Sequence, residues 1–156
     1  MMTMSRRCAM SLILVLGWSV NVAAQTDVEV TGSGGTPLVM NWETAEWGPP
    51  SSPPGFPAGL RNASIAHDPE TGGITYLGRF PAGSRFEMHW HTYTETVVVL
   101  QGAVDINLDG TEYTATEGSY VIIPGGAHHD WRVHAGADLV LLARRDGPPD
   151  FNFVER

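Results

Sequence analysis

The sequence is short of cysteine and of positive charge. It has one cysteine, Cys8, and its nine basic residues are all arginines, with no lysine. Without a lysine amine, Schiff-base chemistry is excluded. Acidic residues outnumber basic ones and the formal charge is −8. Phosphate backbones would repel such a chain, so we expect no nucleic-acid partner.

The first 24 residues have the features of a secretory signal peptide. Residues 1–7 (MMTMSRR) carry two arginines and form a basic leader. Residues 8–20 (CAMSLILVLGWSV) are apolar, and residues 22–24 (VAA) form a small-residue cleavage site. The apolar run is shorter than the ~20 residues of a membrane span. We therefore expect cleavage after residue 24, no membrane contact afterwards, and a periplasmic or secreted protein. The adjacent arginine pair leaves twin-arginine export open beside the ordinary route.

Cleavage at this point would leave 132 residues, enough for one domain with one hydrophobic core. The loss of two arginines would shift the formal charge from −8 to −10. Cys8 would leave with the signal. The mature chain would then have no disulfide in an oxidising compartment, and no thiolate for metal binding or nucleophilic catalysis.

Past residue 24 the sequence is typical of an all-β protein. Short runs rich in Val, Ile, Thr, Tyr and Phe are separated by Gly, Pro, Asn and Asp, without a sustained helical period. Asp109-Gly110, between two such runs, predicts a hairpin. Many short strands at this spacing predict a sandwich or barrel. The predicted strands cover residues 37–41, 73–80, 85–91, 95–101, 103–108, 111–114, 119–123, 129–134, 138–144 and 151–154.

We expect residues 25–72 to hold N-terminal strands and a proline-rich loop, and residues 73–156 to hold the barrel, as one domain. The stretch 48–59 (GPPSSPPGFPAG) has five prolines and cannot be a central strand. We interpret it as an irregular loop over the barrel, held partly by Phe56 and by nearby tryptophans. A lid over a pocket is the alternative.

Two stretches carry residues suited to metal binding. Residues 83–102 (GSRFEMHWHTYTETVVVLQG) contain His89, His91 and Glu95, and residues 118–129 (GSYVIIPGGAHH) add a histidine behind a Pro-Gly turn. His89 and His91 are two residues apart, so on a strand both side chains point to one face. A hairpin can bring Glu95 back beside them. Three imidazoles and a carboxylate suit a divalent transition metal.

The spacing of these residues resembles the two signatures of the cupin superfamily. The first is matched at every specified position by Gly83-x5-His89-x-His91-x3-Glu95-x6-Gly102, and the second by Gly118-x5-Pro124-x-Gly126-x2-His129. The resemblance implies a small double-stranded β-helix, or jelly-roll barrel, with one metal inside. The implied ligands are His89, His91, Glu95 and His129.

Details of the match indicate a small, secreted, single-domain member of this superfamily. The two signatures are separated by 15 residues, 103–117, as in small microbial cupins, and the closing residues 147–151 (GPPDF) look like the tail of ChrR-like cupins. One position departs from the pattern, because Val133 stands where the family often has asparagine. That asparagine is not a ligand, so the predicted metal site is unaffected.

Four histidines outside the first signature need separate interpretations. His128 and His129 compete for the fourth ligand position; the spacing favours His129, and only one of two neighbours on a strand faces the interior. We expect His128 at the rim or surface, and His67 on a surface loop. For His134, a surface position and a contact with the metal ligands are both open.

Strand alternation also predicts the neighbours of the metal. Arg85 and Glu87 would share the face of the first two histidines, and Arg85 or Arg79 would then either clamp a substrate carboxylate or form a structural ion pair. Trp131 and Val133 would line the cavity. Tyr93 would lie at the mouth, and the opposite face of the strand would carry Phe86, Met88 and Trp90.

An apolar stripe of this kind requires a cover. Packing of the proline-rich segment over the stripe is one explanation. A second subunit is the other, and it would make the protein a homodimer.

Three neutral imidazoles and one carboxylate leave a six-coordinate ion two open positions, which suits Fe, Mn, Ni or Zn. A small molecule can then bind through oxygen atoms, with the metal as Lewis acid. We therefore expect a metal-dependent enzyme on a small oxygen-rich molecule, of the dioxygenase type, with Glu95 able to detach and act as base. A non-catalytic cupin that binds metal or ligand, and a sugar or keto-acid isomerase, remain alternatives.

Overall fold

The structure is a computed structural model, and it describes residues 37–155. The signal peptide predicted for residues 1–24, with Cys8, lies outside the described residues, so export stays a prediction. Between residues 37 and 155, no helix is long and apolar enough to cross a bilayer. The one helical element in this range is a short 3-10 turn, η1 (Trp42–Thr44).

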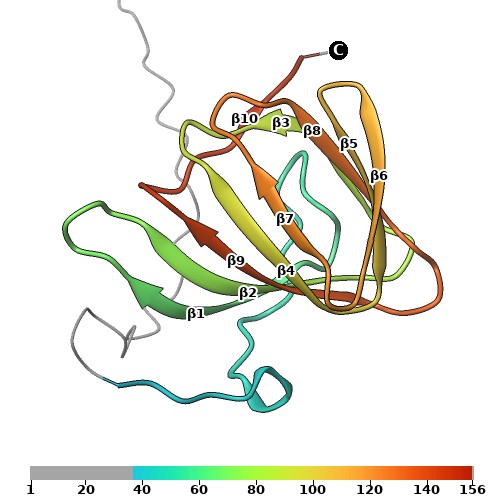
Figure 1. The fold of residues 1–156 in the computed structure, drawn as a ribbon. Helices are drawn as coiled ribbons and strands as arrows, with labels where there is room; N and C mark the ends of the chain where they lie inside the picture. Colours follow the sequence, from blue (N-terminus) through green and yellow to red (C-terminus); the bar gives the residue numbers. More distant parts are fainter. Residues whose placement is uncertain (1–36, 156) are drawn as a thin grey trace, which may run out of the picture.

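The described chain forms two five-stranded antiparallel sheets that lie face to face (Figure 1). One sheet has the order β1-β2-β9-β4-β7 and the other β10-β3-β8-β5-β6. This confirms the predicted all-β jelly-roll architecture. The strands are β1 (Arg61–His67), β2 (Ile74–Phe80), β3 (Arg85–Trp90), β4 (Glu95–Gln101), β5 (Ala103–Leu108), β6 (Thr111–Thr116), β7 (Tyr120–Ile123), β8 (His129–Val133), β9 (Leu139–Arg145) and β10 (Asn152–Phe153).

The hydrophobic core lies between the two sheets, because alternate residues of each strand point inward. Val97 and Val99 of β4 are buried at 1 % exposure, and across the sheet they pair with Ala143 and Leu141 of β9. From β3 onward the chain crosses between the sheets repeatedly. Residues far apart in sequence therefore meet on the two inner faces.

The β5–β6 hairpin turns at Asp109 and Gly110, as predicted. Both residues have positive φ, 48° and 84°, which is the conformation of a two-residue type I′ turn. The turn pairs Leu108 with Thr111. It also leaves β6 on the edge of its sheet.

The structure corrects two predictions near the N-terminal side. Residues 37–41 form no strand; Val39 is 98 % exposed, and Asn41 accepts a hydrogen bond from the Glu43 N–H at the start of η1. Conversely, β1 was not predicted, because RNASIAH has little of the β-branched and aromatic content that marks strands. Its pairing with β2, Arg61 opposite Arg79 at one end, makes it a strand.

A β-bulge in β3 overturns the predicted face of several side chains. Phe86 pairs with Trp131 and His89 pairs with His129, so three steps along β3 match two steps along β8. The extra residue turns Phe86 inward, to 6 % exposure, while Arg85 is exposed. The predictions that Arg85 lies inside and that Phe86 lies outside are therefore wrong.

The proline-rich loop packs against the aromatic end of the core, beside β3 (Figure 1). The ring of Phe56 lies 4.9 Å from that of Phe86 and 4.7 Å from that of Phe151. The Gly55 carbonyl oxygen accepts a hydrogen bond from the Glu87 N–H at 3.0 Å. The predicted irregular loop is thus present, and it covers β3.

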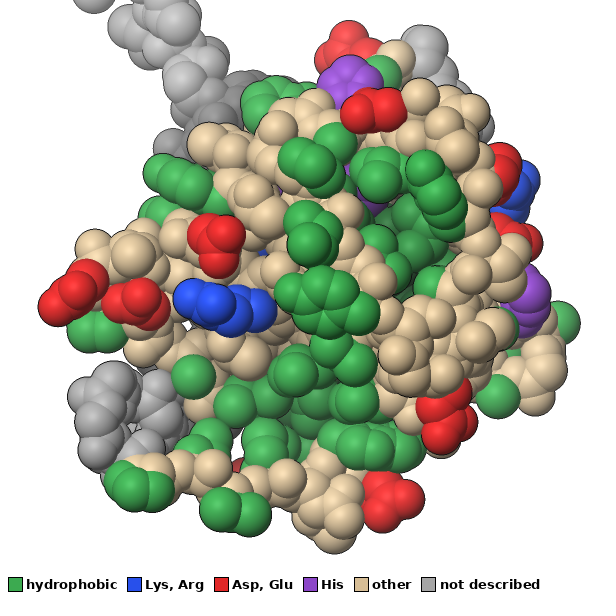
Figure 2. Space-filling model, viewed as in Figure 1, with side chains coloured by type: hydrophobic (Ala, Val, Ile, Leu, Met, Phe, Trp, Pro, Cys, Tyr) green, Lys and Arg blue, Asp and Glu red, His purple; other side chains and the backbone are tan. Residues whose placement is uncertain are grey.

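Hydrophobic side chains gather on the outer face of the first sheet, over β7 and β4 (Figure 2). Tyr120 and Ile122 of β7 are 65 % and 54 % exposed. Val98 of β4 lies between Tyr120 and Leu142 in the sheet register, so an apolar row crosses three strands. The homodimer, one of the two alternatives from the sequence, stays a prediction.

Candidate metal centre

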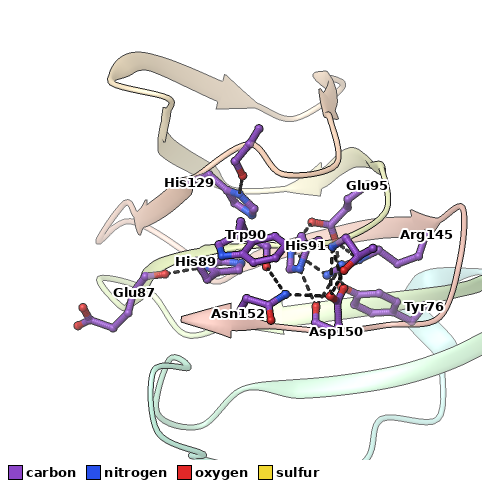
Figure 3. Close-up of polar contacts among 12 residues, drawn as sticks. Tyr76, Glu87, His89, Trp90, His91, Glu95, His129, Arg145, Asp150 and Asn152 are labelled. Atoms are coloured by element: carbon purple, nitrogen blue, oxygen red, sulfur yellow. Dashed lines mark hydrogen bonds and ion pairs between the residues drawn. The ribbon is translucent and has the colours of Figure 1, made fainter. Parts of the chain in front are cut away.

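Three histidines converge between the sheets. His89 lies on β3, His91 follows the end of β3, and His129 opens β8 directly opposite His89. One ring nitrogen of each lies within 4.8 Å of the others, and none of the three residues is more than 1 % exposed. Figure 3 shows the three rings turned toward one another. The structure therefore brings together three of the four predicted ligands.

The hydrogen bonds of the three rings select the tautomer that suits a metal. The Nδ1 of His89 pairs with the Glu87 carbonyl oxygen at 2.7 Å, and the Nδ1 of His129 with that of Ala127 at 3.1 Å. The Nδ1 of His91 is 2.7 Å from another backbone carbonyl. A carbonyl only accepts, so each Nδ1 carries a proton, and in the neutral ring Nε2 has the lone pair. The Nε2 of His91 also accepts a hydrogen bond from Arg145 Nη2 at 2.9 Å, a bond that a metal ion on this nitrogen would replace.

The group also passes a direct test of fit to a metal ion. The Nε2 of His129 is buried and has no hydrogen-bond partner, which is unfavourable for a polar atom. A divalent cation bound to three imidazole nitrogens would satisfy it. Neutral, preoriented imidazoles are the form in which histidine binds such ions.

Burial keeps two of the imidazoles neutral. It lowers the pKa of His89 to about 3, helped by the neighbouring His129. Burial likewise lowers the pKa of His129 to about 4, with smaller opposing effects from its hydrogen bond to Ala127 and from Glu95. At neutral pH, protons therefore do not compete for these two nitrogens.

Glu95 lies beside the imidazoles, at the start of β4, and is 3 % exposed. Its Oε2 is 3.4 Å from the Nε2 of His91, while its Oε1 accepts hydrogen bonds from the Tyr76 hydroxyl and from Arg145. Burial alone would raise the pKa of Glu95, but its pairing with His91 and the charge of Arg145 lower it to about 2. Its role as a fourth ligand stays a prediction.

Arg145, a buried charged residue of the interior, was not predicted from the sequence. Arg145 ends β9 at 2 % exposure, and its Nη2 donates to the Nε2 of His91 at 2.9 Å. A sequence signal existed: Leu139, Leu141 and Ala143 point inward, so alternation places Arg145 inward too. The predicted strand ended one residue too early, at 144, and hid this.

Tyr76 of β2 is the second polar residue that was missed. Its hydroxyl donates to Glu95 Oε1 at 3.0 Å. Burial, followed by the negative charge of Glu95, raises its pKa. The phenol is thus a neutral donor at any physiological pH.

The C-terminal tail completes the site. The Asp150 carbonyl oxygen is the acceptor for Nδ1 of His91, at 2.7 Å. The Asp150 carboxylate accepts hydrogen bonds from the Thr92 hydroxyl at 2.6 Å and from the Asn152 amide at 2.8 Å, which fixes the tail (Figure 3). The ring of Phe151 lies 4.9 Å from that of His91. The tail therefore orients one imidazole and helps to exclude water.

The remaining histidines lie away from the centre. His128 is exposed, as predicted, and His67 is exposed at the end of β1 rather than in a loop. His134 pairs with Asp105 at 3.1 Å on the surface, so it does not contact the ligands.

The other predicted neighbours divide between interior and surface. Trp131 and Val133 point inward, as predicted. Tyr93 is 42 % exposed in the turn after His91. Arg79 stacks on Trp47, 4.4 Å from the ring centroid, rather than in the centre.

Comparison with known proteins agrees with this fold. The Cupin domain family matches residues 76–143. A cupin 2 conserved barrel domain protein from Rhodopseudomonas palustris superposes with a TM-score of 0.62 and 16 % identity, over 72 % of this chain and 79 % of that chain. Residues 76–143 therefore match the Cupin domain family, and the described chain has the barrel fold of a cupin protein.

Two further similarities bear on function. The complex of Rhodobacter sphaeroides SigE with the anti-sigma ChrR gives a TM-score of 0.53 at 25 % identity, over 68 % of this chain and 52 % of that chain. Quercetin 2,3-dioxygenase of Bacillus subtilis is 37 % identical over 54 residues, which is 34 % of this chain and 16 % of that protein. The chain thus matches only a small part of the dioxygenase.

Proposed function

We propose that this chain is a metal-dependent enzyme that acts on a small oxygen-rich molecule, with a reaction of the dioxygenase type. His89, His91 and His129 would hold one divalent transition metal, Fe, Mn, Ni or Zn, and Glu95 would be the fourth ligand. One observation carries the proposal: three imidazoles, each oriented by a backbone carbonyl, converge at a buried point where His129 Nε2 lacks a partner.

A metal in this centre would supply a Lewis acid for an oxygen-bearing substrate. The residues of the chain would orient that substrate and keep water away. Phe86 stacks on His89 with ring centroids 4.1 Å apart, and Phe151 stands edge-on to His91. Flat molecules with neighbouring oxygen atoms, such as diketones, enols and catechols, fit an aromatic wall beside a metal. The local similarity to quercetin 2,3-dioxygenase supports the same class.

Elemental analysis of the purified protein tests the metal centre. We expect about one bound divalent ion per chain, a large loss in His129→Ala, and little loss in His128→Ala. The two residues are adjacent, but only one is buried. No ion in the wild type, or equal losses in the two variants, would end the proposal.

Oxygen uptake tests the reaction. The metal-loaded protein is screened in an oxygen electrode against diketones, enols and catechols, with His129→Ala as the control. We expect uptake with at least one class and none with the variant. Turnover without oxygen uptake would indicate an isomerase instead.

A non-catalytic metal-binding cupin is the second candidate. The observation in its favour is burial: the three histidines are at most 1 % exposed. Such burial favours a resident ion over a substrate that must reach the metal in every turnover. Full metal occupancy with neither oxygen uptake nor turnover would support this candidate.

A further inference from the structure

The two carboxylate oxygens of Glu95 have different surroundings. Oε1 accepts two hydrogen bonds, from the Tyr76 hydroxyl at 3.0 Å and from Arg145 Nε at 3.1 Å. Oε2 lies 3.4 Å from the Nε2 of His91, on the side of the three imidazoles. One oxygen is thus saturated by protein donors, and the other lies beside the imidazole of His91.

The two donors are themselves held in place. Arg145 is the direct register partner of Glu95 across β4 and β9. Its Nη1 lies 3.5 Å from the Asp150 carbonyl oxygen, and its guanidinium carbon lies 5.0 Å from the Phe151 ring centroid. Tyr76, on the adjacent strand β2, pairs with Ala143 of β9. Both donors therefore project from rigid strands of one sheet.

Rotation of Glu95 away from this position would leave its partners unsatisfied. Arg145 is 2 % exposed, and a buried cation that loses its anion is strongly unfavourable. The buried Tyr76 hydroxyl would lose its acceptor as well. The same contacts that orient Oε2 thus oppose detachment of the carboxylate.

We propose that Tyr76 and Arg145 are positioning residues that fix Oε1 of Glu95, so that Glu95 gives Oε2 alone to the metal and stays bound. This inference rests on the proposed function, since it requires a metal at the three imidazoles. It replaces the expectation that Glu95 detaches and acts as base. A proton acceptor then has to come from another group or from the substrate.

A double-mutant cycle in metal affinity tests the inference. The variants are Tyr76→Phe, Glu95→Gln and the pair together, with the dissociation constant for Ni²⁺ measured by competition with a chromophoric chelator. Tyr76→Phe removes one donor to Oε1 without any change of charge. We expect it to weaken Ni²⁺ binding about 10-fold or more, as the loss of a partner behind a ligand does. In the Glu95→Gln background we expect Tyr76→Phe to weaken Ni²⁺ binding by less than about 2-fold.

Arg145→Lys gives a second check, because it keeps the charge but loses the planar fork of donors. Arg145 also donates to His91 Nε2 at 2.9 Å, so the Tyr76 cycle decides whether the effect passes through Glu95. We expect about 10- to 100-fold weaker Ni²⁺ binding. The matched control is Tyr120→Phe, at a side chain that is 65 % exposed. This variant should bind Ni²⁺ with the affinity of the wild type. Thermal unfolding of the metal-free proteins verifies that each variant folds. If Arg145→Lys does not fold, the Tyr76 cycle decides alone.

The outcomes separate the inference from the proposed function. Wild-type affinity in both Tyr76→Phe and Arg145→Lys would overturn the positioning role. An equal effect of Tyr76→Phe with and without the Glu95 carboxylate would overturn it too, because the effect would not pass through Glu95. A wild type without Ni²⁺ binding would instead overturn the metal centre itself, and the positioning role with it.

Discussion

The metal-free protein should lose stability when the pH is lowered from 7 to 5. His89 and His129 have folded-state pKa values of about 3 and about 4, below the 6.5 of an ordinary histidine. Below pH 6.5 the unfolded chain therefore binds protons that the folded chain does not. The stability contributed by these neutral rings is complete above pH 6.5, and it is lost as the pH falls from 6.5 toward the folded-state values.

The size of the effect follows from the two pKa values. One pKa unit corresponds to ~1.4 kcal/mol, and at pH 5 an unfolded imidazole lies about 1.5 units below its own pKa, so each ring loses about 2 kcal/mol. His89 and His129 together lose about 4 kcal/mol, a large part of the ~5–15 kcal/mol of a small domain. Glu95, with a pKa lowered to about 2, adds its own loss mainly below pH 4.5.

Urea unfolding at pH 7 and pH 5, after removal of metal by a chelator, measures this difference. Tryptophan fluorescence can follow the transition, because Trp131 is buried in the core. His129→Gln should reduce the pH-dependent loss of unfolding free energy by about half, whereas His128→Gln, at an exposed position, should leave that loss unchanged. The reasoning would be refuted if the free energy of unfolding of the wild type fell by less than about 1 kcal/mol between pH 7 and pH 5. An equally large fall in His129→Gln as in the wild type would refute it too.

Two further predictions concern the fold. Phe86→Ala should lower the free energy of unfolding by about 3–5 kcal/mol, whereas Arg85→Ala should change it by less than about 0.5 kcal/mol; urea unfolding compares them. Gly102→Ala should lower the melting temperature more than Gly118→Ala. Both glycines have positive φ, but only at Gly102 would a methyl group lie 2.6 Å from a backbone carbonyl oxygen.

Each pair has an outcome that contradicts the structure. A regular β3 without a bulge would make Arg85→Ala the more disruptive change, because Arg85 would then face the interior. Equal melting temperatures for the two glycine variants would mean that only the backbone conformation matters. The close approach to Asp138 at Gly102 would then be wrong.

The sequence was sufficient where local rules decide the structure. The Asp109-Gly110 turn follows from two residues that tolerate positive φ. The inward direction of His89 and His91 follows from their spacing on a strand, which the bulge does not disturb because it precedes both. The choice of His129 over His128 follows from the spacing of the second signature, since alternation allows only one of the two to face the interior.

Non-local contacts explain the structural features that were not predicted from the sequence. The bulge that turns Phe86 inward depends on the register with β8. The contact of Arg145 with Glu95 joins residues 50 positions apart. The Asp150 carbonyl is a backbone group, so no residue type signals its role toward His91. β1 is a strand because β2 lies beside it, not because of its own composition.

The contact between His91 and Asp150 also constrains the order of assembly during synthesis. The two residues are 59 positions apart, so the ribosome releases His91 long before its acceptor. Until Asp150 emerges and its carboxylate binds Thr92, the imidazole of His91 has no fixed orientation. Both sheets also require the late strands β8 and β9, which join their halves, so loading of an ion would be among the last events of maturation.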